Sequence, residues 1–164
     1  MTHANAQQQS GSPPAMSRGA SVTAARAKDI MTKRVLTLHP GATVAQGLAR
    51  LVQTGHSGMP VIDDRGNALG IFSEHDCVQL LLSDRHHYEE SMHALRVGEV
   101  MTEIRASADP ESDIFLLTSL FVEARVRRIP ILQGQRLAGI VSRRDLVEAI
   151  QQDIERASPP RERS

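Results

Sequence analysis

Residues 139–145, with the sequence GIVSRRD, contain the side chains of this chain that are best suited to hold an anion. Ser142 ends an apolar β-branched run and Asp145 follows three residues later, which indicates a strand that leads into a helix. Free N–H groups at a helix start bind anions, and the guanidinium groups of Arg143 and Arg144 match phosphate oxygens in bidentate pairs. The same serine-to-acid spacing is also the capping box of a helix, which needs no ligand. Both interpretations, a phosphate site and a helix cap, are open at this point.

A second stretch, GIFSEHD at 70–76, has the same glycine, serine and aspartate at the same spacing. Between Ser73 and Asp76, however, Glu74 and His75 replace the two arginines. A carboxylate repels phosphate, so this half should favour a less charged ligand or stay empty. The comparison predicts one strong anion site, at residues 139–145, and a weaker one at residues 70–76.

Two more arginines, Arg127 and Arg128, precede the strand that should pair with the one ending at Ser142. Before the corresponding strand in the first half of the chain, Ser57 and Gly58 stand at these places. A hairpin would bring four guanidinium groups together, and each charge-assisted hydrogen bond to phosphate contributes about 1.5 to 3 kcal/mol. A solvated surface is the alternative, but 19 basic and 19 acidic residues give no general positive excess that would explain the cluster.

An internal repeat organises the chain. DIMTKRVLTLHP at 29–40 returns as EVMTEIRASADP at 99–110, and MPVI at 59–62 returns as IPIL at 129–132, both after 70 residues. One unit of about 60 residues buries little surface, so two copies should pack together and leave clefts along the seam, where small ligands bind.

Each copy predicts the element order β-α-β-β-α. The expected extended stretches (34–38, 103–107) are each followed by a helix with helical apolar spacing, around Leu51 and around Leu117. Turn signals at DRGN and Gly134 predict hairpins of strands 59–63 with 68–73 and 129–133 with 137–142, and the last helices begin at Ser73 and Ser142. The apolar residues Met59, Phe115 and Phe121 are expected in the core.

With these motifs in order and twice, the chain resembles a tandem pair of CBS domains, the arrangement called a Bateman module. The resemblance covers about Lys28 to Ile154 and implies an α/β (α+β) fold, two CBS repeats with pseudo-twofold symmetry around a central cleft. The expected segments are a disordered N-terminal arm (1–27), CBS domain 1 (28–83), a polar linker (84–98), CBS domain 2 (99–155) and a disordered tail (156–164).

The resemblance implies sites for adenine nucleotides, where serine faces phosphate and aspartate binds the ribose hydroxyls. The strong site would then include Ser142 and Asp145 with Arg127, Arg128, Arg143, Arg144, Ile129, Val126, Thr32, Leu36, His56, Ser57, Gly58 and Met59. The weaker site would include Ser73, Asp76, Thr102 and Ala106.

The function that follows is a regulatory sensor without catalytic activity, which binds AMP, ADP or ATP as its regulatory ligand, requires no other cofactor and signals to a protein partner by a conformational shift. The alternatives are a homodimerisation scaffold without a physiological ligand, and a module for another adenosyl ligand such as S-adenosylmethionine. A homodimer is implied in either case.

Composition limits the other functions. The net charge of zero argues against nucleic acid as a partner, and no apolar run reaches the roughly 18 to 20 residues that cross a membrane. The single cysteine, Cys77, is expected to be a small buried residue and fits the reducing cytoplasm. His86, His87 and His93 lie in the linker without the spacing of a metal site.

Overall fold

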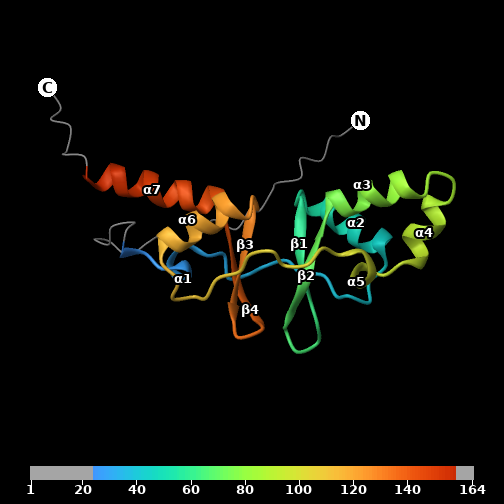
Figure 1. Cartoon of the computed structure of the whole chain (residues 1–164), viewed down its shortest axis with the longest axis horizontal. Coiled ribbons are helices and arrows are strands. Elements are labelled where there is room, and N and C mark those ends of the chain that lie inside the picture. The colour runs from blue at the N-terminus through green and yellow to red at the C-terminus, as the bar shows by residue number, and fades with distance from the viewer. Residues whose placement is uncertain (1–23, 158–164) are drawn as a thin grey trace, which may run out of the picture. The chain divides into compact units, whose positions relative to one another are not determined.

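A computed structural model describes residues 24–157 of the chain, which form two compact units (Figure 1). The first unit is Leu36–Ile104, and the described part of the second consists of residues 24–35 and 105–157. Each unit contains one antiparallel hairpin with helices packed beside it.

The first unit begins with helix α2 (Val44–Thr54), whose ends are set by local sequence. The Thr43 hydroxyl accepts from the backbone N–H of Gln46, and the Gln46 side chain accepts from the Thr43 N–H, which is a complete capping box. Strands β1 (Gly58–Ile62) and β2 (Ala68–Ser73) follow, and then helices α3 (Glu74–Ser83), α4 (Tyr88–Ala94) and α5 (Val97–Val100).

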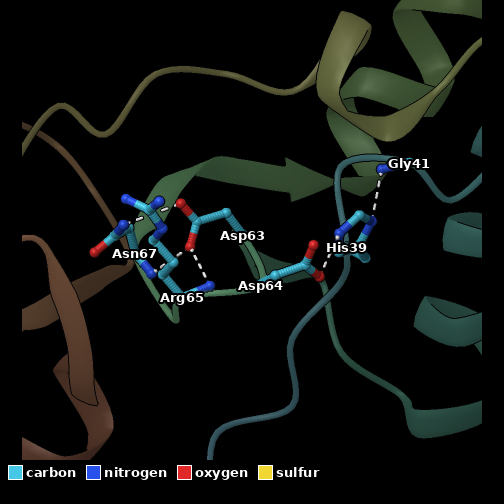
Figure 2. Close-up of polar contacts among 6 residues, drawn as sticks. All are labelled: His39, Gly41, Asp63, Asp64, Arg65 and Asn67. Carbon is cyan, nitrogen blue, oxygen red and sulfur yellow. Dashed lines mark hydrogen bonds and ion pairs between the residues drawn. The ribbon is translucent and has the colours of Figure 1, made fainter.

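The turn between β1 and β2 is held by Asp63 (Figure 2). Its carboxylate accepts from the backbone N–H groups of Arg65 and Asn67, both at 2.9 Å, and from the Asn67 amide at 3.0 Å. These hydrogen bonds hold the pKa of Asp63 below its usual value. Beside the turn, His39 accepts from the Gly41 N–H at Nδ1 and therefore donates to Asp64 from Nε2.

The second unit contains α1 (Ala27–Ile30), α6 (Ile114–Glu123), β3 (Arg128–Gln133), β4 (Arg136–Ser142) and α7 (Arg143–Ala157). The Asp113 carboxylate caps α6 by accepting from the Leu116 N–H at 2.9 Å. The turn of the β3–β4 hairpin contains Gly134 in the left-handed region, at φ 64°, so both expected hairpins and their turns are confirmed.

Single residues pair with the outer edges of both hairpins. Leu38 pairs with Val61 of β1, and Thr102 pairs with Ile71 of β2 through hydrogen bonds of 2.8 and 2.9 Å. In the second unit Ala108 pairs with Ile131, and Thr32 pairs with Ile140 at 2.9 and 3.0 Å. The expected extended stretches are therefore not continuous strands: 34–38 contains one bridge residue, Leu38, and 103–107 lies between the bridge residues Thr102 and Ala108.

Two glycines allow the Met-Thr segments, Met31-Thr32 and Met101-Thr102, to lie close against the hairpins. A Cβ on Gly70 would lie 2.7 Å from the Thr102 carbonyl oxygen, and one on Gly139 would lie 2.9 Å from the Thr32 carbonyl oxygen. Thr32 stands at the start of the first sequence repeat but pairs with the hairpin of the second, and Thr102 does the reverse. The starting segments of the two repeats are therefore exchanged, so the packed units differ from the sequence repeats.

Each unit has its own apolar core. Met59 and Phe121 are 1% and 5% exposed and confirm their expected burial, whereas Phe115 is 63% exposed, so its expected core position is wrong. On α6, Phe115 follows the buried Ile114 and thus points about 100° away from the face that packs on the unit. The segment expected as a polar linker contains α4, which contacts α2 and α3.

Candidate functional site

Ser142 and Asp145 lie at the junction of β4 and α7 and form a hydrogen-bonded helix cap. The Asp145 carboxylate oxygen Oδ2 accepts from the Ser142 backbone N–H at 2.6 Å and from the Ser142 hydroxyl at 2.8 Å. The hydroxyl in turn accepts from the Asp145 N–H at 3.2 Å. The capping box expected from the spacing is present, and Asp145 is still partly exposed to solvent.

The surroundings of Asp145 disfavour its negative charge. Burial raises the pKa of this carboxyl, and the negative charge of Glu148 acts in the same direction. The hydrogen bonds from Ser142 and the positive charge of Arg128 lower the pKa in opposition, but the net shift is upward. Additional hydrogen-bond donors, such as hydroxyl groups of a ligand, would therefore stabilise the charged form of this carboxylate.

The hairpin brings the two arginine pairs together along the backbone. Arg128 stands opposite Ser142 in the strand register, and the Arg143 N–H donates to the Arg127 carbonyl at 3.4 Å. Arg127 and Arg143 are exposed, Arg128 is half-buried, and the exposed Arg144 pairs with Glu148 at 2.8 Å. The second unit therefore has a positive surface where α7 begins.

The corresponding junction in the first unit is more closed. Oδ2 of Asp76 accepts from the Ser73 N–H at 2.7 Å and from the Ser73 hydroxyl at 2.8 Å. Its other oxygen accepts from the Thr102 hydroxyl at 2.9 Å, and the residue is only 4% exposed. The sequence placed Thr102 with Ser73 and Asp76 at the weaker site, but it did not indicate this hydrogen bond, which spans 26 residues.

An open pocket of about 570 Å³ lies in the first unit along α3 and α5. Its lining consists of Asp76, Gln79, Leu80, Leu82, Ser83 and Val100. Both carboxylate oxygens of Asp76 already accept hydrogen bonds, and a negative charge beside this pocket disfavours a phosphate. The remaining lining is largely apolar, so the pocket offers few groups to a phosphate.

The other residues expected at the strong site are divided between the units. Thr32, Val126 and Ile129 lie in the second unit together with Asp145, and the Ile129 side chain is fully buried. Leu36, His56, Ser57, Gly58 and Met59 belong to the first unit. Ala106, expected at the weaker site, is a buried residue of the second unit, whereas Ser73, Asp76 and Thr102 belong to the first.

Cys77 is 6% exposed, as expected. Burial, with the charge of the neighbouring Asp76, raises the pKa of its thiol to about 11. Among residues 24–157, no three histidine, cysteine, aspartate or glutamate side chains are grouped closely enough to hold a metal ion.

The two repeats each match the family model of the CBS domain, at residues 27–83 and 97–152. The chain belongs to the CBS domain family. The matched regions are the two sequence repeats, and each contains a Ser-x-x-Asp junction. The expected tandem pair of CBS domains with an α+β fold is thereby confirmed.

Solved structures of CBS-pair proteins have the same fold. CBSX2 from Arabidopsis thaliana is 27% identical, with a TM-score of 0.73 over 83% of this chain and 100% of that chain. A structure of CBSX2 in complex with AMP is also 27% identical, with a TM-score of 0.68 over 77% of this chain and 96% of that one.

Curated relatives include the CBS domain-containing protein YhcV from Bacillus subtilis, 26% identical over 73% of this chain and 81% of its own length. An uncharacterized 33.4 kDa protein from Thermofilum pendens is 27% identical over 63% of this chain but 32% of its own length. The chain thus spans half or less of the first curated relatives that it matches. None of the helices within residues 24–157 combines the length and apolar character that crossing a bilayer requires.

Proposed function

We propose that this chain is a regulatory module that binds an adenine nucleotide, AMP, ADP or ATP, where α7 begins. The observation that carries the proposal is the partly exposed Asp145 carboxylate, which lies beside Ser142 and the arginine pairs at the start of a helix of 15 residues. Free N–H groups and a positive dipole at such a helix end favour phosphate. The AMP complex of CBSX2 adds support from a relative with this fold.

In this proposal the ribose hydroxyls donate to Asp145, and the phosphate binds to Ser142 and the arginines. The Ser142 hydroxyl has one hydrogen, which Asp145 Oδ2 accepts without a ligand. If the Ser142 hydroxyl donates this hydrogen to a phosphate oxygen instead, a ribose hydroxyl takes its place as the donor to Asp145. Each of these groups then keeps a hydrogen-bond partner. Backbone groups near Ile129 are proposed to meet the adenine.

Arg144 must be shared between its present partner and the ligand. Its pairing joins an exposed guanidinium to the partly exposed Glu148 and contributes at most about 1 kcal/mol, so a phosphate can compete for the guanidinium. Bound nucleotide would then favour one conformation of the chain, and a partner protein would recognise that conformation. S-adenosylmethionine, which has a ribose but no phosphate, would use Asp145 without needing the arginines.

A second candidate function, a homodimerisation scaffold without a small ligand, is favoured by two observations. The Ser-Asp hydrogen bonds at both junctions are complete without a ligand. Large apolar side chains are also exposed on the helices of both units, and they include Val52, Val78, Leu81 and Leu82 in the first and Phe115, Leu116, Val122, Val147, Ile150 and Ile154 in the second. Such faces fit a second copy of the chain, and light scattering that gives the mass of a monomer would contradict the dimer.

Titration calorimetry with AMP, ATP and S-adenosylmethionine on the wild type and Asp145→Ala tests the nucleotide proposal. The wild type should bind a phosphorylated ligand, and the variant should bind it about tenfold or more weakly, because hydrogen bonds to a charged acceptor contribute about 1.5 to 3 kcal/mol. Unchanged affinity in Asp145→Ala would remove the ribose assignment.

Asp113→Ala is the matched control. This variant removes another carboxylate that caps a helix of the same unit, with an expected loss of about 1 kcal/mol of stability. Its nucleotide affinity should equal that of the wild type. A parallel loss of affinity in both variants would attribute the effect to lost helix capping and not to a ribose contact.

A further inference from the structure

The two Met-Thr segments place their threonines at equivalent positions in the two units. Thr102 exchanges two backbone hydrogen bonds with Ile71, and Thr32 does the same with Ile140. Ile71 lies two residues before Ser73, and Ile140 lies two residues before Ser142. The backbone therefore places a threonine beside the Ser-x-x-Asp junction in both units.

The Thr102 and Thr32 hydroxyls make different contacts, although the backbones of the two residues pair in the same way. Thr102 donates to Asp76 Oδ1 at 2.9 Å, whereas among the described residues the structure has no hydrogen bond from the Thr32 hydroxyl to Asp145. With the two donors of Ser73, both oxygens of Asp76 have partners, and the residue is 4% exposed. Asp145 remains partly exposed.

The position of Thr102 is fixed by tight packing. Gly70 leaves no room for a side chain, since a Cβ there would lie 2.7 Å from the Thr102 carbonyl oxygen and 2.8 Å from the Met101 sulfur. The segment after α5 can therefore not move away from β2 without breaking the paired hydrogen bonds to Ile71. Thr102 thus holds its hydroxyl against Asp76.

We propose that Thr102 determines ligand stoichiometry by closing the Asp76 carboxylate to ribose hydroxyls, so that each chain takes nucleotide at Asp145 alone. This inference rests on the proposed function, because it assumes that the aspartate of a Ser-x-x-Asp junction is a ribose acceptor. Thr102 then prevents a ligand from binding to Asp76 and does not itself contact a ligand. The charge of Glu74 would act on phosphate only, whereas Thr102 acts on any ligand with a ribose.

Removal of the Thr102 hydroxyl should open the first junction. Thr102→Val leaves Asp76 Oδ1 buried without a donor, and a ribose hydroxyl can satisfy this oxygen when the valine turns its methyl groups away from it. Thr102→Ser is the matched control, since it keeps the hydroxyl. Adenosine is the appropriate probe beside AMP, because it carries the ribose hydroxyls and no phosphate that Glu74 would repel.

The experiment is calorimetric titration of the full chain with adenosine and with AMP. The wild type and Thr102→Ser should bind one adenosine per chain, and Thr102→Val should bind two. If Thr102→Val is folded by circular dichroism and still binds one adenosine, the proposed role of Thr102 is wrong. Thr102→Ala serves as the second variant if the valine does not fold.

The wild type alone can also overturn the inference, because two ribose ligands per chain would mean that Thr102 does not close Asp76. That result would leave the proposed nucleotide function intact. Absence of binding to the wild type and to both hydroxyl-free variants would contradict both proposals. Binding to Thr102→Val alone would support the closing of Asp76 and contradict the proposed site at Asp145.

Discussion

The side chains of Asp76 and Asp145 show how one motif acquires two environments. Both accept from the serine three residues earlier, and this pairing depends only on local spacing at a helix start. The sequence could therefore predict it at both places. The Thr102 hydrogen bond depends on the rotamer of a residue 26 positions away, and neither composition nor periodicity contains that information.

The buried Cys77 thiol should be unreactive in the folded protein. With a pKa of about 11, only about one thiol in a thousand is ionised at pH 8, and the thiolate is the form that attacks a disulfide reagent. Labelling with an aromatic disulfide should be slow at pH 8 and should accelerate as the pH rises toward 11. The protein unfolded in guanidinium chloride is the control, and fast labelling of the folded chain would contradict the burial.

At the scale of elements, the ends of α2 and α6 differ at equivalent positions. Gly55 follows α2 in the left-handed region at φ 67°, and Arg125, 70 residues later, has φ 52°. A residue with a Cβ pays about 1 to 2 kcal/mol for this conformation, whereas glycine adopts it freely. The second repeat thus has a strained residue two positions before Arg127.

Arg125→Gly should stabilise the protein. Relief of the left-handed strain exceeds the entropy that glycine loses on folding, about 0.5 to 1 kcal/mol, so we expect a gain of roughly 0.5 to 1 kcal/mol. Urea unfolding monitored by circular dichroism measures it. Gly55→Arg is the matched reverse change and should cost a similar amount, and a less stable Arg125→Gly would show that the arginine makes compensating contacts.

The hairpins and the longer helices could be predicted because their signals are local. Turn glycines, β-branched strands and helical apolar spacing lie within a few residues of one another. Helix α4 has no fully buried residue and packs on the core through the partly buried Met92. Its position depends on contacts with α2 and α3 and on the Ser91 hydroxyl, which donates to Asp84, and these could not be foreseen from periodicity.

At the scale of the whole chain, the exchanged Met-Thr segments separate the sequence repeat from the packed unit. The repeat was visible because it lies in the order of the residues. The exchange was not, because it depends on pairs such as Thr32 with Ile140, which are more than 100 residues apart. The proposed nucleotide acceptor, Asp145, lies in the same packed unit as Thr32, although Thr32 comes from the start of the other sequence repeat.

Thermal unfolding of the full chain with and without AMP tests the central claim most directly. A ligand that binds only the folded state adds about 2.7 kcal/mol at 100 times its Kd, which corresponds to a rise in Tm of roughly 5 to 11 °C for a chain of this size. We predict a rise of this kind that continues with the logarithm of the AMP concentration above the Kd and is reduced in Asp145→Ala. A Tm that stays constant at millimolar AMP, ADP and ATP would contradict the nucleotide function and favour the dimerisation scaffold.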